Sequence, residues 1–126
     1  MAVSKQKYIL IKIGRQTWSL PLLDSSDFFQ IRNIVPLPRA SDKIVGLTYH
    51  QGHIITILAS DKLLGTKLVN LPQHCLRIDW QGEHYGLLVD LVGEVIAPVK
   101  ITNDYVLVNK TKINILSIAD VIKQLS

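Results

Sequence analysis

The fold is decided by the stretch Pro36–Leu58, which reads PLPRASDKIVGLTYHQGHIITIL. Its two prolines fix their own φ angles and hold the entry to the segment extended. Two apolar runs follow, and Gln51-Gly52 between them is typical of a tight hairpin turn. The sequence therefore predicts two antiparallel strands, Ile44–Tyr49 and His53–Leu58, without a reactive constellation beside them. This pattern favours a docking surface over a catalytic centre.

The same pattern, two apolar runs joined by a turn, recurs on both sides of this stretch. The apolar residues are mostly Ile, Val and Leu, and β-branched side chains favour strands. Turns every 8 to 12 residues with few helical windows predict a small barrel or sandwich rather than a βαβ sheet. We expect strands at Tyr8–Ile13, Thr17–Leu20, Gln73–Trp80, Glu83–Leu91, Tyr105–Val108 and Lys112–Leu116. Between them we expect a polar loop or cap at Asp24–Asp27, a helical turn at Ser60–Gly65, a connector at Thr66–Pro72, a turn at Asn109–Thr111 and a packing helix after Ser117.

Length and composition indicate one unit, residues 1–126. A chain of 126 residues with 48% hydrophobic content can bury roughly two-thirds of its unfolded surface in a single core. Its apolar runs are far shorter than the about 20 residues needed to span a bilayer, so we expect no direct membrane insertion. Lysines interrupt the N-terminal apolar segment, which argues against a signal peptide and favours a cytoplasmic protein. A lone cysteine, Cys75, excludes an internal disulfide.

The net charge of +4 raises the alternative of a small basic β-barrel nucleic-acid-binding module. Nucleic-acid binders concentrate basic side chains in a stripe and add exposed aromatic residues that stack on bases. Here the Lys and Arg residues are scattered among ten acids, and aromatic residues make up 6% of the chain. The charge is better explained as a solvated surface, so the preferred interpretation has no nucleic-acid partner.

Catalytic and metal-binding interpretations find little support. His50 and His53 flank a turn, but no cysteine or acid adds a recognisable zinc-ligand spacing. Neighbouring strand residues point to opposite faces, so His74 and Cys75 form no dyad, and Cys75 is expected to be a buried structural thiol. There is no nucleophile elbow and no phosphate-binding glycine loop. We expect no catalytic residue, metal or cofactor, and thus no enzyme.

Several side chains are ambiguous from the sequence. Trp18 and Trp80 lie within strand patterns and are expected to fill the interior. The crowded apolar residues Phe28, Phe29 and Ile34 fit either a core plug or a partner-facing patch. Both interpretations stay open at this point.

Four segments carry a resemblance in their order and spacing: Pro36–Ala40, Ile44–Leu47, Gln51–Ile55 and Tyr85–Asp90. Together they make the chain resemble the CheW-like chemotaxis coupling proteins, from about Tyr8 to the terminal helix. The resemblance implies an all-β fold of two small SH3-like five-stranded β-barrel subdomains over a shared core, with a short C-terminal helix. It also implies an adaptor whose partners are a chemosensory histidine kinase regulatory domain and the cytoplasmic tip of a methyl-accepting receptor.

The resemblance also implies where partners bind. Asp27 stands at the position of a family glutamate, Gly46 and Gly52 open and end the signature Gly-x-x-Asn-x-Arg-Gly, and a second motif ends in Val-Asp. Asp90, the acid of that motif, fits a turn-capping or barrel-bridging carboxylate. The expected partner-binding residues are Asp27, Phe28, Ile34, Gly46, Gln51, Gly52, Val89 and Asp90.

The chain departs from the family pattern at several positions. Gln51 replaces the signature arginine, so a bidentate guanidinium contact is absent there. Tyr49-His50 replaces Asn-Leu, and Ala59-Ser60-Asp61 replaces Asp-Leu-Arg. The sequence thus indicates a divergent coupling protein, in a flagellar system or one dedicated to twitching or other pilus-driven surface motility. A degenerate member without kinase coupling is the other interpretation.

Overall fold

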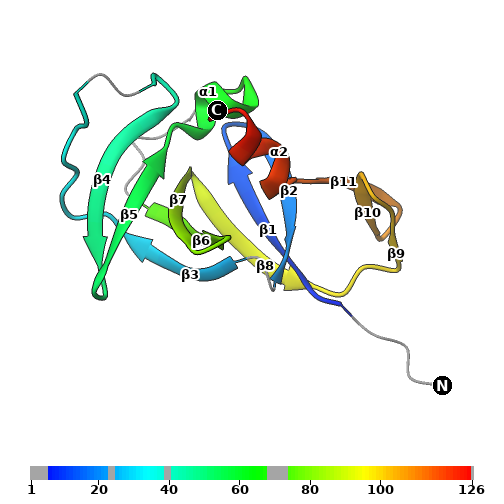
Figure 1. Cartoon of the computed structure of the whole chain (residues 1–126). Coiled ribbons are helices and arrows are strands. Elements are labelled where there is room, and N and C mark those ends of the chain that lie inside the picture. Colours follow the sequence, from blue (N-terminus) through cyan, green and yellow to red (C-terminus); the bar gives the residue numbers. More distant parts are fainter. Residues whose placement is uncertain (1–5, 23–24, 39–40, 68–73, 126) are drawn as a thin grey trace.

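The structure, a computed structural model, describes residues 6–22, 25–38, 41–67 and 74–125 of the chain (Figure 1). The described strands form two sheets. The six-stranded sheet has the order β8 (Leu91–Ile96), β1 (Tyr8–Ile13), β2 (Gln16–Pro21), β11 (Thr111–Ile115), β10 (Tyr105–Val108) and β9 (Lys100–Ile101). The five-stranded sheet has the order β3 (Ser25–Gln30), β6 (His74–Trp80), β7 (Glu83–Val89), β5 (His53–Leu58) and β4 (Ile44–His50).

This arrangement confirms the predicted all-β fold with two β subdomains. The N-terminal hairpin β1–β2 pairs with the C-terminal strands, β1 with β8 and β2 with β11, so the two subdomains are intertwined along the chain. Five strands were expected in each, and the six-stranded sheet contains one more because the two-residue strand β9 pairs with β10.

The hairpin turns form where the sequence predicts them. Gln51-Gly52, Gln81-Gly82 and Asn109-Lys110 each place both central residues at positive φ, with values of 50° and 84°, 50° and 82°, and 47° and 66°. Two successive positive φ values match the twist of the flanking strands. The last turn is one residue shorter than expected because Thr111, the first residue of β11, already pairs with Val108 of β10.

The main core lies between the two sheets. Alternate residues of the five-stranded sheet, among them Leu76, Leu87 and Val89, pack against Ile11 and Leu20 of the other sheet. As expected, Trp18 and Trp80 pack against this core. A smaller core lies on the opposite face of the five-stranded sheet and contains Phe29, Ile55, Ile57, Cys75 and Leu88. Successive side chains of a strand point to opposite faces of the sheet, so the apolar residues of these strands cover both faces.

Both predicted helices are present and short. α1 (Ser60–Leu64) ends at Gly65, whose φ is 67°. α2 (Ile118–Lys123) begins after Ser117, whose side chain accepts a hydrogen bond from the Asp120 N–H, as an N-cap does. In the part of the chain that the structure describes, no helix is long and apolar enough to cross a membrane.

Two segments differ from the sequence prediction. The polar stretch ending at Asp27 is not a loop, because β3 already begins at Ser25 and pairs with β6. The run Glu83–Leu91 is not one strand: Asp90 donates its N–H to the Lys12 carbonyl, and the chain passes there from β7 in one sheet to β8 in the other. Residues 1–5, residue 24 of the predicted loop and residues 68–73, which include most of the predicted connector, lie outside the described residues.

Candidate partner-binding surface

The five-stranded sheet has two end strands, β3 and β4, which are not paired with each other. The chain leaves β3 after Gln30 and comes back alongside β4. There Val35 and Leu47 exchange two backbone hydrogen bonds, of 2.8 and 2.9 Å. Thr48 Oγ1 adds a 2.5 Å hydrogen bond to the Asn33 carbonyl. These contacts tie the connecting segment to one part of β4 and leave a gap between the facing edges of β3 and β4.

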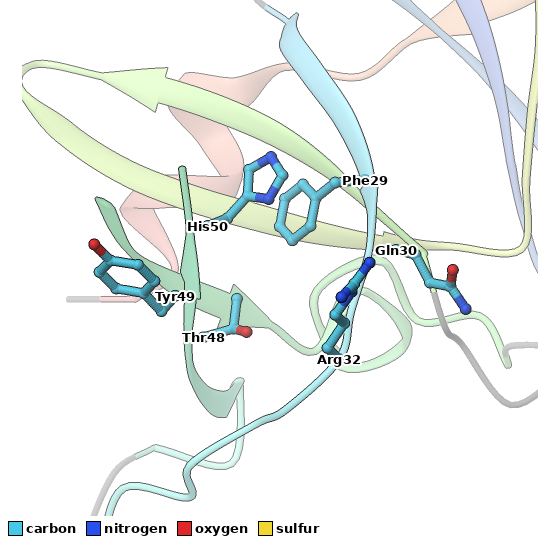
Figure 2. A pocket seen from close by; sticks show the side chains of 6 residues that line it. All are labelled: Phe29, Gln30, Arg32, Thr48, Tyr49 and His50. Carbon is cyan, nitrogen blue, oxygen red and sulfur yellow. The ribbon is translucent and has the colours of Figure 1, made fainter. Parts of the chain in front are cut away.

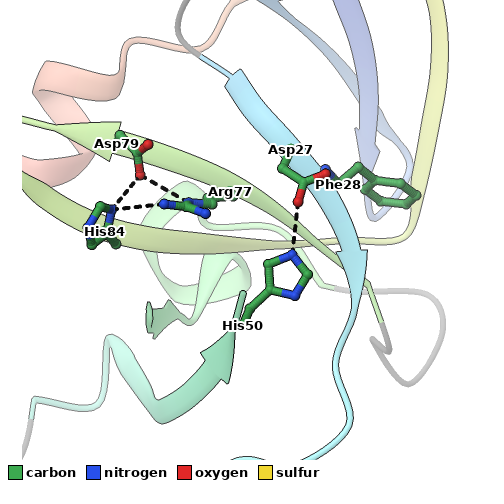
Figure 3. Close-up of polar contacts among 6 residues, drawn as sticks. All are labelled: Asp27, Phe28, His50, Arg77, Asp79 and His84. Atoms are coloured by element: carbon green, nitrogen blue, oxygen red, sulfur yellow. Dashed lines mark hydrogen bonds and ion pairs between the residues drawn. The ribbon is translucent and has the colours of Figure 1, made fainter. Parts of the chain in front are cut away.

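His50 and Asp27 bridge this gap through their side chains (Figure 3). His50 Nε2 lies 2.8 Å from Asp27 Oδ2, and the imidazole stacks on the Phe29 ring at 4.0 Å and 13°. Asp27 Oδ1 also accepts the Phe28 N–H at 2.8 Å. The hydrogen bond with His50 outweighs partial burial and lowers the pKa of Asp27, so the ionised carboxylate is favoured. The carboxylate is thus held in place at the gap.

A second polar cluster lies on the same face of the sheet. Arg77 pairs with Asp27 in the register, and its Nε lies 3.2 Å from Asp79 Oδ1. His84 Nδ1 lies 2.7 Å from the same oxygen, and the His53 ring lies 4.5 Å from the His84 ring. Burial by itself would raise the pKa of Asp79, but its hydrogen bonds with His84 and Arg77 lower it. Polar side chains therefore cover one end of this face, next to the smaller core.

The structure brings several of the predicted partner-binding residues together. Gln51 and Gly52 form the exposed tip of the β4–β5 hairpin, directly after His50, and so lie on the same side as Asp27. Phe28 follows Asp27 in β3 and its side chain points to the opposite face of the strand (Figure 3). There it is 41% exposed and stacks on His74 with ring centroids 5.3 Å apart. Of the two interpretations left open for the aromatic pair, a core role fits Phe29 and a partly exposed surface position fits Phe28.

Ile34 and Gly46 form a second group. A Cβ at Gly46 would lie 2.5 Å from the Val35 carbonyl oxygen and 2.7 Å from the Ile34 side chain. The glycine is thus required by the close approach of the 34–35 segment. Gly46 is buried, and it supports the surface from beneath rather than offering a side chain to a partner.

Val89 and Asp90 lie apart from these groups. The Val89 side chain is 1% exposed within the main core, so it cannot contact a partner in this fold, and we remove it from the candidate surface. Asp90 Oδ2 accepts the Gly14 N–H at 2.5 Å. It therefore joins the β7–β8 junction to the β1–β2 turn, which matches the predicted turn-capping carboxylate.

Sequence reasoning missed a set of exposed apolar side chains along β4 and its neighbours. Tyr49 is 74% exposed, and Val35 and Ile54 are each 62% exposed. Tyr49 and Ile54 are register partners just before and after the predicted turn, and their pairing on one face was a signal that could have revealed them. Two cavities adjoin Tyr49, of about 280 Å³ and about 260 Å³. Figure 2 shows the second, with Phe29, Gln30, Arg32, Thr48, Tyr49 and His50 around it.

The titratable groups of the described residues do not gather into a metal site. Among the described residues no three His, Cys, Asp or Glu side chains are placed to hold an ion. Burial raises the pKa of Cys75 to about 12, so its thiol stays protonated at neutral pH. This agrees with the predicted structural thiol.

Comparison with known proteins gives a consistent result. The family model described as CheW-like domain matches residues 7–109. Among solved structures, the fold is similar to the crystal structure of the scaffolding protein TtCheW from Thermoanaerobacter tengcongensis, with a TM-score of 0.77 and 19% identity over 90% of each chain. No curated protein matches the chain.

Proposed function

The chain belongs to the CheW-like domain family, and from this premise we propose that it is a non-enzymatic adaptor that joins a methyl-accepting chemoreceptor to a chemosensory histidine kinase. The observation that carries the proposal is the surface at the gap between β3 and β4. A hydrogen-bonded carboxylate, a stacked histidine and an exposed hairpin tip occupy it. Such a surface offers shape and charge for recognition.

The kinase regulatory domain would bind at this surface. Asp27 supplies a fixed charge on one face of β3, Phe28 supplies a partly exposed ring on the other face, and Gln51-Gly52 supplies a protruding turn. Ile34 lies close to Gly46 of β4. Because the Asp27 carboxylate is already held by His50, its geometry need not be ordered on binding, which reduces the entropic cost of association.

The receptor tip would bind near the junction of the two subdomains. Asp90 fixes the passage from β7 to β8, and Leu91 and Val95 on β8 are exposed. Strand β8 is an edge strand of its sheet. Exposed apolar side chains on an edge strand are unfavourable in water, and the helical hairpin of a receptor tip would cover them.

The proposal places the protein in the cytoplasm and gives it no chemistry of its own. Twitching or another form of surface motility is the proposed output, with a flagellar system as the alternative.

Isothermal titration calorimetry against the cognate kinase regulatory domain and the receptor tip tests the proposal. We expect Kd values in the micromolar range, about −8 kcal/mol, and weaker kinase binding for Asp27→Lys. Asp104→Lys, which changes an exposed acid next to the distant strand β10, is the matched control and should bind normally. A folded sample that binds neither partner would contradict the adaptor function. Salt-sensitive oligonucleotide binding would instead support the nucleic-acid interpretation.

A further inference from the structure

Backbone groups of both β3 and β4 face the gap between these strands. Leu47 directs its N–H and C=O away from β5, toward Val35. Backbone groups alternate along a strand, so Tyr49, two residues further on, directs its own N–H and C=O to the same open edge. On β3 the Phe28 N–H bonds to the Asp27 carboxylate, which places Phe28 and, by the same alternation, Gln30 toward the gap. In the described part of the chain no strand covers this stretch.

The two cavities adjoin each other at the edge of β4, because Thr48 and Tyr49 border both. Leu47 and Ile54 border only the cavity of about 280 Å³. Phe29 and His50 border only the cavity of about 260 Å³ (Figure 2). A strand added to the edge of β4 would direct successive side chains alternately to the two faces of the sheet. Neighbouring side chains of such a segment would therefore face different cavities.

The cavities differ in chemistry. The first is bordered by exposed Val35, Tyr49 and Ile54, which suits an aliphatic side chain. The second has the Arg32 guanidinium at its border, and within residues 6–22, 25–38, 41–67 and 74–125 no carboxylate pairs with Arg32. The nearby Asp27 is already bonded to His50. A carboxylate from outside would therefore complement the charge of Arg32.

We propose that the edge of β4 at Tyr49 binds an extended segment of a partner protein in which an acidic residue stands between two aliphatic residues. The segment pairs with β4 by strand addition. Its acid reaches Arg32 on one face, and the flanking aliphatic side chains cover Tyr49 and Ile54 on the other. This goes beyond the adaptor proposal: the segment occupies the gap that the kinase domain is proposed to contact, and its binding is tested in the absence of the kinase domain and the receptor tip.

The test uses fluorescence polarisation of a labelled peptide, Ser-Thr-Ile-Glu-Val-Thr-Ser, with the full chain. We expect saturable binding with a Kd below about 1 mM and slower amide exchange at Tyr49 in the bound state. Arg32→Glu should weaken binding by about tenfold at low salt and favour the peptide that carries Lys in place of Glu. Arg15→Glu, at the exposed β1–β2 turn, is the charge-matched control and should bind as the parent chain does.

Backbone pairing is tested separately with a peptide N-methylated at Ile or Val, which loses a strand hydrogen bond but keeps its side chains. Loss of binding with this peptide supports strand addition. Equal binding of the methylated peptide, an unchanged affinity of Arg32→Glu, or no binding at about 1 mM would overturn the proposal. Concentration-dependent dimerisation that Arg32→Glu abolishes would overturn it in favour of a second copy as the occupant.

Discussion

His50 on β4 and Asp27 on β3 meet in a 2.8 Å hydrogen bond, although no backbone ladder joins these two strands in the described part of the chain. The imidazole also stacks face to face on the Phe29 ring. One side-chain pair thus holds together the two edges that border the candidate partner-binding surface.

The first prediction concerns the ionisation of Asp27. Its folded pKa lies below the ordinary value of 3.8, chiefly because of the hydrogen bond with His50. A carboxyl group with a lowered folded pKa stabilises the fold at pH values above its unfolded pKa. This stabilisation is lost as the pH falls through the folded pKa. His50→Phe keeps a ring on Phe29 but removes the hydrogen bond. We expect the pKa of Asp27, measured from its carboxyl ¹³C shift, to rise in this variant.

Asp79 supplies the internal control for that titration, because its pKa is lowered by its own hydrogen bonds with His84 and Arg77. The pKa of Asp79 should remain below 3.8 in the His50→Phe variant. An unchanged pKa at Asp27 would mean that His50 does not hold the carboxylate in solution.

A second prediction concerns Gly46. The added methyl of Gly46→Ala would collide with the Val35 carbonyl oxygen at 2.5 Å, and overpacking of this kind costs about 1–3 kcal/mol. Urea unfolding should show this loss, and amide exchange at Val35 and Leu47 should speed up. Gly93→Ala is the milder comparison, since its nearest contact, the Leu10 carbonyl oxygen, is 3.3 Å away and a small shift would relieve it. Equal stability of the two variants would contradict the close approach.

Ser60 gives a third prediction. Its buried hydroxyl donates to the Leu88 carbonyl and ties α1 to β7. Ser60→Ala removes that donor, and a buried acceptor left unpaired costs about 1–3 kcal/mol. Ser41→Ala changes an exposed hydroxyl and should leave the midpoint of urea unfolding almost unchanged. If Ser60→Ala were as stable as Ser41→Ala, the hydroxyl would not serve as a tie.

Cys75 provides a fourth prediction. With a pKa of about 12 raised by burial, its thiol should resist an aromatic disulfide reagent at pH 8 for as long as the sheet stays closed. Labelling then reports opening of the smaller core, and the unfolded chain in guanidinium should react at once. Rapid labelling of the native protein would show that Cys75 is accessible.

The sequence alone predicted the turns and caps that depend on residues close together in the chain. The Gln51-Gly52 and Gln81-Gly82 turns and the Ser117 cap follow from local chemistry, and the structure contains them. The start of β3 was missed because Ser25 pairs with Ile78, far away in the chain. Long-range pairing of this kind leaves no local pattern for a sequence to display.

The candidate site shows the same division. The protruding tip at Gln51 followed from its turn chemistry, whereas the His50–Asp27 bond needs the curvature of a whole sheet to bring β3 and β4 together. Val89 was placed at the surface by a motif that ends in Val-Asp, and the structure buries it. The motif marked the passage between sheets, where Asp90 bonds to the Gly14 N–H, rather than a contact surface.

The last prediction separates a working coupling protein from a degenerate one. Gln51 stands at the exposed tip with a φ of 50°, where the family signature has arginine. Gln51→Arg adds a charge without altering the buried structure, so the stability should stay within about 0.5 kcal/mol of the parent chain. If the parent chain binds the kinase domain in calorimetry, Gln51→Arg should change the affinity only modestly. If only the variant binds, kinase coupling has been lost and the degenerate interpretation is correct. Gln81→Arg, at the equivalent β6–β7 turn with the same φ, is the matched control and should not create binding.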